Sequence, residues 1–306
     1  MLLLTAFNST LEILMSPAAF SMVPRLIDED MYSEEAAMST SIYKFAELLG
    51  IAVAGIIVAN LGIIGALFID VLTFFMAALI ISRINYKEEA TEEKSKLNVV
   101  NTISDIKEGF GYLKVNKIVL LSITLFAIIN LCLAPINVML PIFAEKILLG
   151  GPEVLSLLSI SLSIGTILGG VTTAGVVAKI KGNKLIIMSS LSFGVGYGML
   201  ALPGNVPGTQ VLSLIIAILG FFIMGFMIPA MTAPIKGYIV TKTDKNLLGR
   251  ISGIIGLIST GIFPLGCAIT GVVASYLPVS LIFLIMGAII MLTSMYLWIG
   301  GGLKNA

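Results

Sequence analysis

Three acidic residues lie inside long apolar stretches of the sequence: Glu12, Glu47 and Asp70. A carboxyl group in a medium of low dielectric constant favours its protonated form, so it can bind and release a proton, as a proton-coupled carrier requires. Glu12 has no basic neighbour in its own stretch, so we expect a functional role for it. Glu47 can instead pair with Lys44 one helical turn away, and Asp70 is close enough to the end of its stretch to be a solvated acid.

A second group of residues could line a path for a substrate. Asn130 and Asn137 are seven residues apart, which places them on one helix face, where they could line a path or join helices by hydrogen bonds. Met139 and Phe222 could belong to the soft wall of a site that accepts many ligands. Packing in the core or against lipid is the alternative for both side chains.

The composition excludes several classes of protein. Of the 306 residues, 58% are hydrophobic and 11% are charged, whereas about a quarter are charged in a soluble domain. The chain has no histidine, which excludes a Ser-His-Asp triad and a His-containing zinc site. Its two cysteines, Cys132 and Cys267, are far apart in apolar stretches, and its net charge is +1. We therefore expect a polytopic membrane protein with no catalytic residue, metal, cofactor or nucleic-acid partner.

Hydropathy and turn residues such as Asn60-Leu61-Gly62 divide the chain into apolar spans. Spans of this length cross the hydrocarbon core of a bilayer as helices. The prediction is an all-α membrane protein with nine transmembrane helices, at about 1–23, 39–59, 63–83, 118–147, 153–178, 183–202, 210–235, 248–276 and 279–299.

The positive charges orient these spans. All but one of the 18 Lys and Arg residues lie at one set of span ends, and Lys146 is the exception. The positive-inside rule makes that set cytoplasmic. The carboxyl terminus is then inside and the amino terminus outside.

One long polar segment, 84–117, separates three spans from six. Val99, Ile103, Ile106, Phe110 and Leu113 follow helical spacing, so its second half predicts an amphipathic helix on the cytoplasmic surface. We therefore expect a partial amino-terminal bundle over 1–83, a cytoplasmic linker over 84–117, and a six-helix bundle over 118–306.

Small residues spaced four apart allow helices to approach closely. Gly165 with Gly169, and Gly249 with Gly253, have this spacing, although such matches also arise by chance among 31 glycines.

Four segments together resemble one known family. They are Ser16–Leu26, Phe68–Phe74 (Phe-Ile-Asp-Val-Leu-Thr-Phe), Ile106–Leu113 (Ile-Lys-Glu-Gly-Phe-Gly-Tyr-Leu), and the prolines and glycines between Pro229 and Gly266. The chain resembles a major facilitator superfamily transporter of the branch of macrolide-efflux and enterobactin-exporter-like permeases. The resemblance makes the spans before the linker equivalent to helices four to six, so that the first three helices are missing.

The resemblance implies functional residues as well. Gly175, Lys179, Gly182 and Lys184 match the family's cytoplasmic gating loop, but Lys179 stands where the pattern has an acid. The fifth-helix Gly-Pro pattern of antiporters is also absent, since Ile51 follows Gly50.

The implied function is export of a drug-like or amphipathic small molecule by alternating access with proton coupling, in a bacterial plasma membrane. One alternative is a truncated fragment that does not transport. A membrane enzyme is the other alternative, because Ser41 and Lys44 match the short Ser-x-x-Lys nucleophile pattern. Substrate identity and oligomeric state are left open.

Overall fold

The computed structural model describes residues 22–23, 26–83, 109, 111–203, 210–244 and 247–300. All regular secondary structure in these residues is helical. The helices are predominantly apolar, and their backbones satisfy their own hydrogen bonds, as a segment in lipid requires. The helices are η1 (Glu29–Met31), α2 (Tyr32–Ser82), α4 (Lys117–Ile142), η2 (Phe143–Ile147), α5 (Pro152–Val177), α6 (Gly182–Leu200), α7 (Gln210–Lys242), α8 (Leu248–Val273) and α9 (Val279–Gly300).

Six stretches among the described residues are long and apolar enough to cross a membrane. They are Asn60–Ser82, Val119–Ile147, Glu153–Val177, Gln210–Lys242, Leu248–Val273 and Val279–Tyr296. The predicted count of nine is therefore not confirmed. The predicted span 183–202 is helical but more polar, with Lys184 near its start. The predicted span 39–59 is also helical, but the side chains of seven of its residues, between positions 51 and 59, lie outside the described ones. The span 1–23 lies almost wholly outside the described residues.

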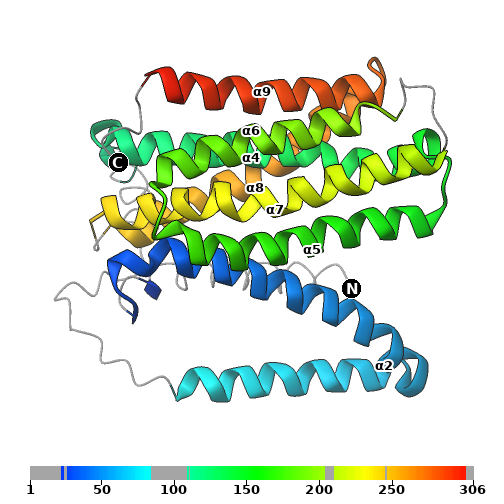
Figure 1. Ribbon diagram of the computed structural model, residues 1–306. Helices are drawn as coiled ribbons and strands as arrows, with labels where there is room; N and C mark the ends of the chain where they lie inside the picture. Colours follow the sequence, from blue (N-terminus) through cyan, green and yellow to red (C-terminus); the bar gives the residue numbers. More distant parts are fainter. Residues whose placement is uncertain are drawn as a thin grey trace.

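Helix α2 consists of two segments, 32–61 and 63–82, joined at Gly62. This glycine has φ 67° and ψ −178°, in the region where an L side chain is strained. The turn predicted at Asn60-Leu61-Gly62 is thus confirmed, and the second segment runs back below the first and diverges from it (Figure 1). The second segment stands apart from the rest of the bundle, and none of the most apolar part of this span is buried.

Helices α4 to α9 lie side by side and enclose the main core (Figure 1). An aromatic cluster ties four of its elements together: Phe143 of η2 contacts Phe221 of α7 and Phe283 of α9, with ring centroids 6.5 and 5.4 Å apart. Tyr197 of α6 contacts Phe283 at 5.8 Å and donates its hydroxyl hydrogen bond to the Cys132 carbonyl of α4. These buried rings hold the helices in one arrangement.

The described end of the linker is attached to this bundle. Leu113 is buried in the main core. Tyr112 Oη and Asn116 Nδ2 both donate hydrogen bonds to the carbonyl oxygen of Lys242, at 2.8 and 3.0 Å, where α7 ends. Most of the predicted linker helix, residues 99–108 and 110, lies outside the described residues.

Candidate functional site

The first segment of α2 joins the α4–α9 bundle through a small-residue interface, formed by Ser33, Ala36, Ala37 and Ser41 of α2 with Gly170 and Ala174 of α5 and Ala233 and Gly237 of α7. The four alanines form one buried cluster. A Cβ atom added at Gly237 would overlap the Ser33 hydroxyl, and one added at Gly170 would lie 2.6 Å from the Ala37 carbonyl oxygen. Only small residues allow the helices to come this close.

A hydrogen bond strengthens this contact. Ser41 Oγ donates to the carbonyl oxygen of Ile167 of α5 at 2.9 Å, and the Ser41 side chain is buried. Lys44 Nζ is instead 2.8 Å from Glu47 Oε2 on the same helix. The Ser-x-x-Lys pattern is therefore not assembled as a nucleophile and its base, because each side chain has another partner.

Glycines also bring α5 against α7. A Cβ atom added at Gly165 or Gly169 would overlap backbone atoms of Phe222 or Phe226, and one at Gly225 would overlap the Leu162 backbone. The close approach expected from the Gly165 and Gly169 spacing is thus confirmed.

The other glycine pair with this spacing gives a different result. Gly249 and Gly253 of α8 meet nothing within 4 Å among the described residues. The same sequence pattern therefore marks a close contact at one place and, among the described residues, none at the other.

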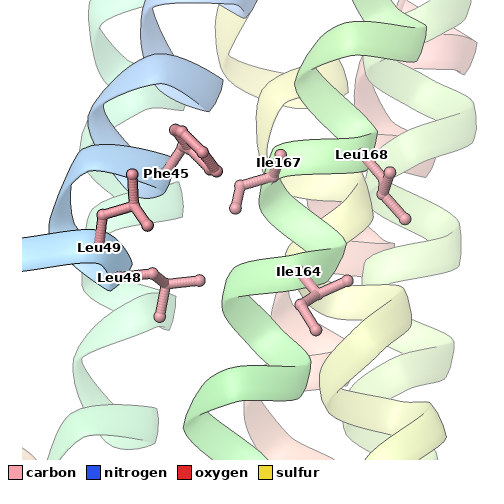
Figure 2. Close-up of a pocket in the computed structure, with 6 residues that line it drawn as sticks. All are labelled: Phe45, Leu48, Leu49, Ile164, Ile167 and Leu168. Carbon is pink, nitrogen blue, oxygen red and sulfur yellow. The ribbon is translucent and has the colours of Figure 1, made fainter. Parts of the chain in front are cut away.

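An apolar pocket of about 380 Å³ opens beyond the small-residue interface, between α2 and α5. Its lining residues are Phe45, Leu48, Leu49, Ile164, Ile167 and Leu168. Phe45 and Leu48 extend toward α5, and Ile167 extends back toward them (Figure 2). α2 therefore touches α5 near the start of α2 and leaves a space farther along. Such a space can receive an apolar group but offers it no charged partner.

Charged groups lie at the closed end of this contact. Ser39 Oγ donates a 2.5 Å hydrogen bond to Glu35 Oε1 on α2. Lys236 of α7 is half-buried and lies next to Gly237 of the small-residue interface. Neither Glu35 nor Lys236 is among the functional residues predicted from the sequence.

The three predicted proton-coupling residues are not brought together. Glu12 lies outside the described residues. Glu47 is exposed and forms the predicted ion pair with Lys44. Asp70 is exposed on the second segment of α2 and is the eleventh residue of the 23-residue candidate span, nearer its middle than expected. The role of each acid in proton coupling stays a prediction.

The predicted substrate-path residues have different surroundings. Asn130 is half-buried and donates to the Phe126 carbonyl at 2.8 Å, while Asn137 is exposed and donates to the Leu133 carbonyl at 3.4 Å. Both bonds stay within α4, and among the described residues neither asparagine is hydrogen-bonded to another helix. Met139 is fully buried in the main core, and the half-buried Phe222 lies 6.2 Å from the ring of Phe226. In this conformation Met139 packs rather than lines an open path.

The predicted gating loop connects α5 to α6. Gly175, Lys179 and Lys184 are exposed. Gly182 is half-buried, and a Cβ atom there would lie 2.5 Å from Tyr238 Oη of α7. The loop therefore touches α7 through Gly182, and the gating role of these four residues stays a prediction.

Among the described residues, no group of three or more His, Cys, Asp or Glu side chains could hold a metal ion. In the interface the Ser41 hydroxyl is bonded to a backbone carbonyl oxygen, and the pocket lining is hydrocarbon. This arrangement suits contact between helices and binding of apolar groups.

One sequence signal could have located the interface. Ser33, Ala37 and Ser41 are spaced four residues apart, which puts three small residues on one face of α2. Their spacing matches that of Gly165 and Gly169, but their partners on α5 and α7 are more than 120 residues away. Long-range pairing of this kind cannot be read from a single helix.

Comparison with known proteins agrees with this architecture. Macrolide efflux protein A of Streptococcus pyogenes is 24% identical over 278 residues, which cover 90% of this chain and 66% of that protein. Two MFS-type transporters of Bacillus subtilis (strain 168) are also similar. YkuC is 24% identical over a match that covers 78% of this chain and 55% of YkuC. YfiS is 26% identical over a match that covers 97% of this chain and 70% of YfiS. The chain thus spans less than two thirds of the length of YkuC and of the streptococcal protein.

The family match covers most of the chain. Residues 1–266 match the Major Facilitator Superfamily. The apolar helices agree with a place in the membrane, and the resemblance noted in the sequence is confirmed at the level of the family. The chain is an integral membrane protein that belongs to the major facilitator superfamily of transporters.

Proposed function

We propose that this chain exports an amphipathic small molecule by alternating access between two groups of helices. The observation that carries the proposal is the contact of α2 with α5: it is tight at Ser41 and Gly170 and opens into an apolar pocket farther along. Two groups of helices that touch at one end and are separated at the other can rock against each other, so that the closed end opens and the open end closes. Alternating access requires this motion.

The apolar lining of the pocket supports an amphipathic substrate. A site built from hydrocarbon side chains selects by size and apolar area rather than by charge. Relatives agree with this class, since one is macrolide efflux protein A and another is the multidrug efflux pump Tap of Mycolicibacterium fortuitum. These names describe the substrates of the relatives and not of this chain. Because a macrolide belongs to the amphipathic class proposed here, it is the first substrate to test.

The organisation that we propose has three parts: a partial amino-terminal bundle over 1–83, a cytoplasmic linker over 84–117, and a six-helix bundle over 118–306. In it the carboxyl terminus lies on the cytoplasmic side of a bacterial plasma membrane. The junctions α5–α6 and α7–α8 then face the cytoplasm, where Lys179, Lys184 and Lys242 lie. The small-residue interface would close the cytoplasmic half.

Proton coupling through Glu12, Glu47 or Asp70 completes the proposal. Glu12→Gln should abolish transport that depends on the proton gradient, because glutamine cannot titrate. Asp70→Asn tests the acid in the second segment of α2 in the same way. Transport by Glu12→Gln with an unchanged pH profile would exclude Glu12.

The test is accumulation of a radiolabelled macrolide in bacterial cells that express this chain. We expect lower accumulation than in cells with an empty vector, and loss of the difference when a proton uncoupler is added. Leu168→Trp, which fills the pocket, should raise accumulation. Leu292→Trp, at an exposed position of α9, is the matched control and should not.

Equal accumulation with and without the chain would contradict transport by this chain alone. It would favour the alternative of a fragment that does not transport. Reactivity of Ser41 toward a serine-directed probe would instead favour a membrane enzyme, which the hydrogen bond from Ser41 to Ile167 makes unfavourable.

A further inference from the structure

Asn116 joins the end of the linker to the start of α4. Residues 111–115 are helical, and the backbone N–H of Asn116 donates to the carbonyl oxygen of Tyr112 at 2.9 Å. Asn116 itself has φ −92° and ψ 87°, outside the helical region, and its Oδ1 accepts a hydrogen bond from the Val119 N–H at 3.3 Å. It is therefore the N-cap of α4, a position at which asparagine is among the preferred residues.

The amide nitrogen of the same side chain bonds to a different helix. Asn116 Nδ2 donates at 3.0 Å to the carbonyl oxygen of Lys242, the last residue of α7. The last four carbonyl groups of a helix have no N–H partner within it, so they accept hydrogen bonds from elsewhere. Tyr112 Oη donates to the same carbonyl oxygen at 2.8 Å and accepts from Asn116 Nδ2 at 3.0 Å. One asparagine thus caps the start of α4 and the end of α7 at the same time.

Apolar packing holds the linker end in the same place. Leu113 lies between these two polar residues and is buried in the main core. A Cβ atom added at Gly109 would lie 2.9 Å from Cδ1 of Ile254 of α8. The linker end therefore packs on the bundle before α4 begins, and the hydrogen bonds of Asn116 fix the direction in which the chain enters α4.

The end of α7 is connected to α2 in two ways. Gly237, five residues before Lys242, lies against Ser33 of α2. The linker also leads along the chain from Ser82, the last residue of α2, to Asn116. A displacement of the end of α7 relative to α2 therefore acts on the direct contact and on the linker together.

We propose that Asn116 is a positioning residue, which fixes the linker end, α4 and α7 to one another so that they move as a unit. Asn116, Tyr112 and the carbonyl group of Lys242 are called the linker joint below. The effect of the linker joint on transport rests on the proposed function, whereas the attachment of the linker end to α7 does not.

Hydrogen exchange of the full chain in detergent measures this attachment. Asn116→Asp keeps the oxygen that caps α4 and replaces the donor by an acceptor next to the Lys242 carbonyl oxygen. Tyr112→Phe removes the other donor. In both variants we expect the amides of residues 111–115 to exchange at least threefold faster, because loss of a hydrogen bond makes local opening more favourable. The amides of residues 117–122 should exchange in Asn116→Asp as in the parent.

Two further variants separate the linker joint from other effects. Thr243→Val removes a buried hydroxyl next to Lys242 that has no hydrogen-bond partner among the described residues, so it should leave both segments unchanged. Asn116→Ala removes the capping oxygen as well as the donor, so both segments should exchange faster. Exchange of residues 111–115 in Asn116→Asp and Tyr112→Phe at the rate of Thr243→Val would overturn the attachment.

The kinetics of macrolide efflux, measured per inserted chain, test the positioning role. We expect Asn116→Asp and Tyr112→Phe to lower the maximal rate at least threefold. The half-saturating concentration should stay within twofold of the parent, since no residue of the linker joint lines the apolar pocket. A merely structural role would reduce the amount of inserted chain and leave both constants unchanged.

Two outcomes distinguish the linker joint from the proposed function. Faster exchange with an unchanged maximal rate per inserted chain would overturn the positioning role. Absence of efflux by the parent, together with the expected exchange pattern, would contradict the proposed function and leave the attachment at Asn116 standing.

Discussion

The hydroxyl of Ser41 donates a 2.9 Å hydrogen bond to the carbonyl oxygen of Ile167, and Ile167 also lines the apolar pocket. This bond therefore marks the place where the close contact of α2 with α5 ends and the open space begins. On one side of it Gly170 lies against Ala37 and Ser41. On the other side Phe45 and Leu48 face α5 across the gap (Figure 2).

Two replacements of Ser41 should distinguish the contribution of its hydrogen bond to stability from the contribution of its small size. Ser41→Ala removes one hydrogen bond between helices and should lower stability by about 0.5–1 kcal/mol. Ser41→Leu adds volume where a Cβ atom of Gly170 would already overlap the Ser41 hydroxyl, so it should cost more and open the contact. The melting temperature in detergent measures both. A larger loss for alanine than for leucine would contradict this packing.

Gly170→Ala should destabilise the interface by about 1–3 kcal/mol, because the new methyl group would lie 2.6 Å from the Ala37 carbonyl oxygen. Gly198→Ala is the matched control, since a Cβ atom there meets nothing within 4 Å. That change should be neutral or slightly stabilising, because alanine favours the helix. Thermal unfolding of both variants checks the prediction, which fails if the two behave alike.

A large side chain in the pocket should impair transport more than it impairs folding. Ile164→Trp fills space between α2 and α5, so we expect at least a fivefold loss of macrolide efflux with a melting temperature near that of the parent. Leu265→Trp, at an exposed position of α8, controls for the bulk of tryptophan. Equal efflux by Ile164→Trp and the parent would exclude the pocket from the transport path.

Gly62→Ala should weaken the turn between the two segments of α2. Its φ of 67° and ψ of −178° lie in a region used almost only by glycine, where another residue costs about 1–3 kcal/mol, and this strain falls on the link between two helices. Gly50→Ala, in the same helix and with nothing within 4 Å of the added atom, should cost nothing. The melting temperatures of the two variants test this prediction. We expect that of Gly62→Ala to be several degrees lower than that of Gly50→Ala.

Local patterns of the sequence predicted the helices because each helix in a membrane must satisfy its own backbone hydrogen bonds. The break at Asn60-Leu61-Gly62, the ion pair of Lys44 with Glu47 and the close approach at Gly165 and Gly169 are features of this kind. All of them depend on residues near one another in one helix or on the size of a single side chain. The family was also recognisable from four short segments.

Only the tertiary structure decided which residues meet across helices. It placed Gly170 against Ser41 and Gly237 against Ser33, buried Met139 in the core, and left Gly249 and Gly253 without a neighbour among the described residues. Hydropathy cannot make these assignments, because lipid and the protein core are equally apolar and both faces of such a helix look alike in the sequence. The contact of α2 with α5 and α7 depends on the shape of small residues, and this shape becomes informative only when the partner helix is in place.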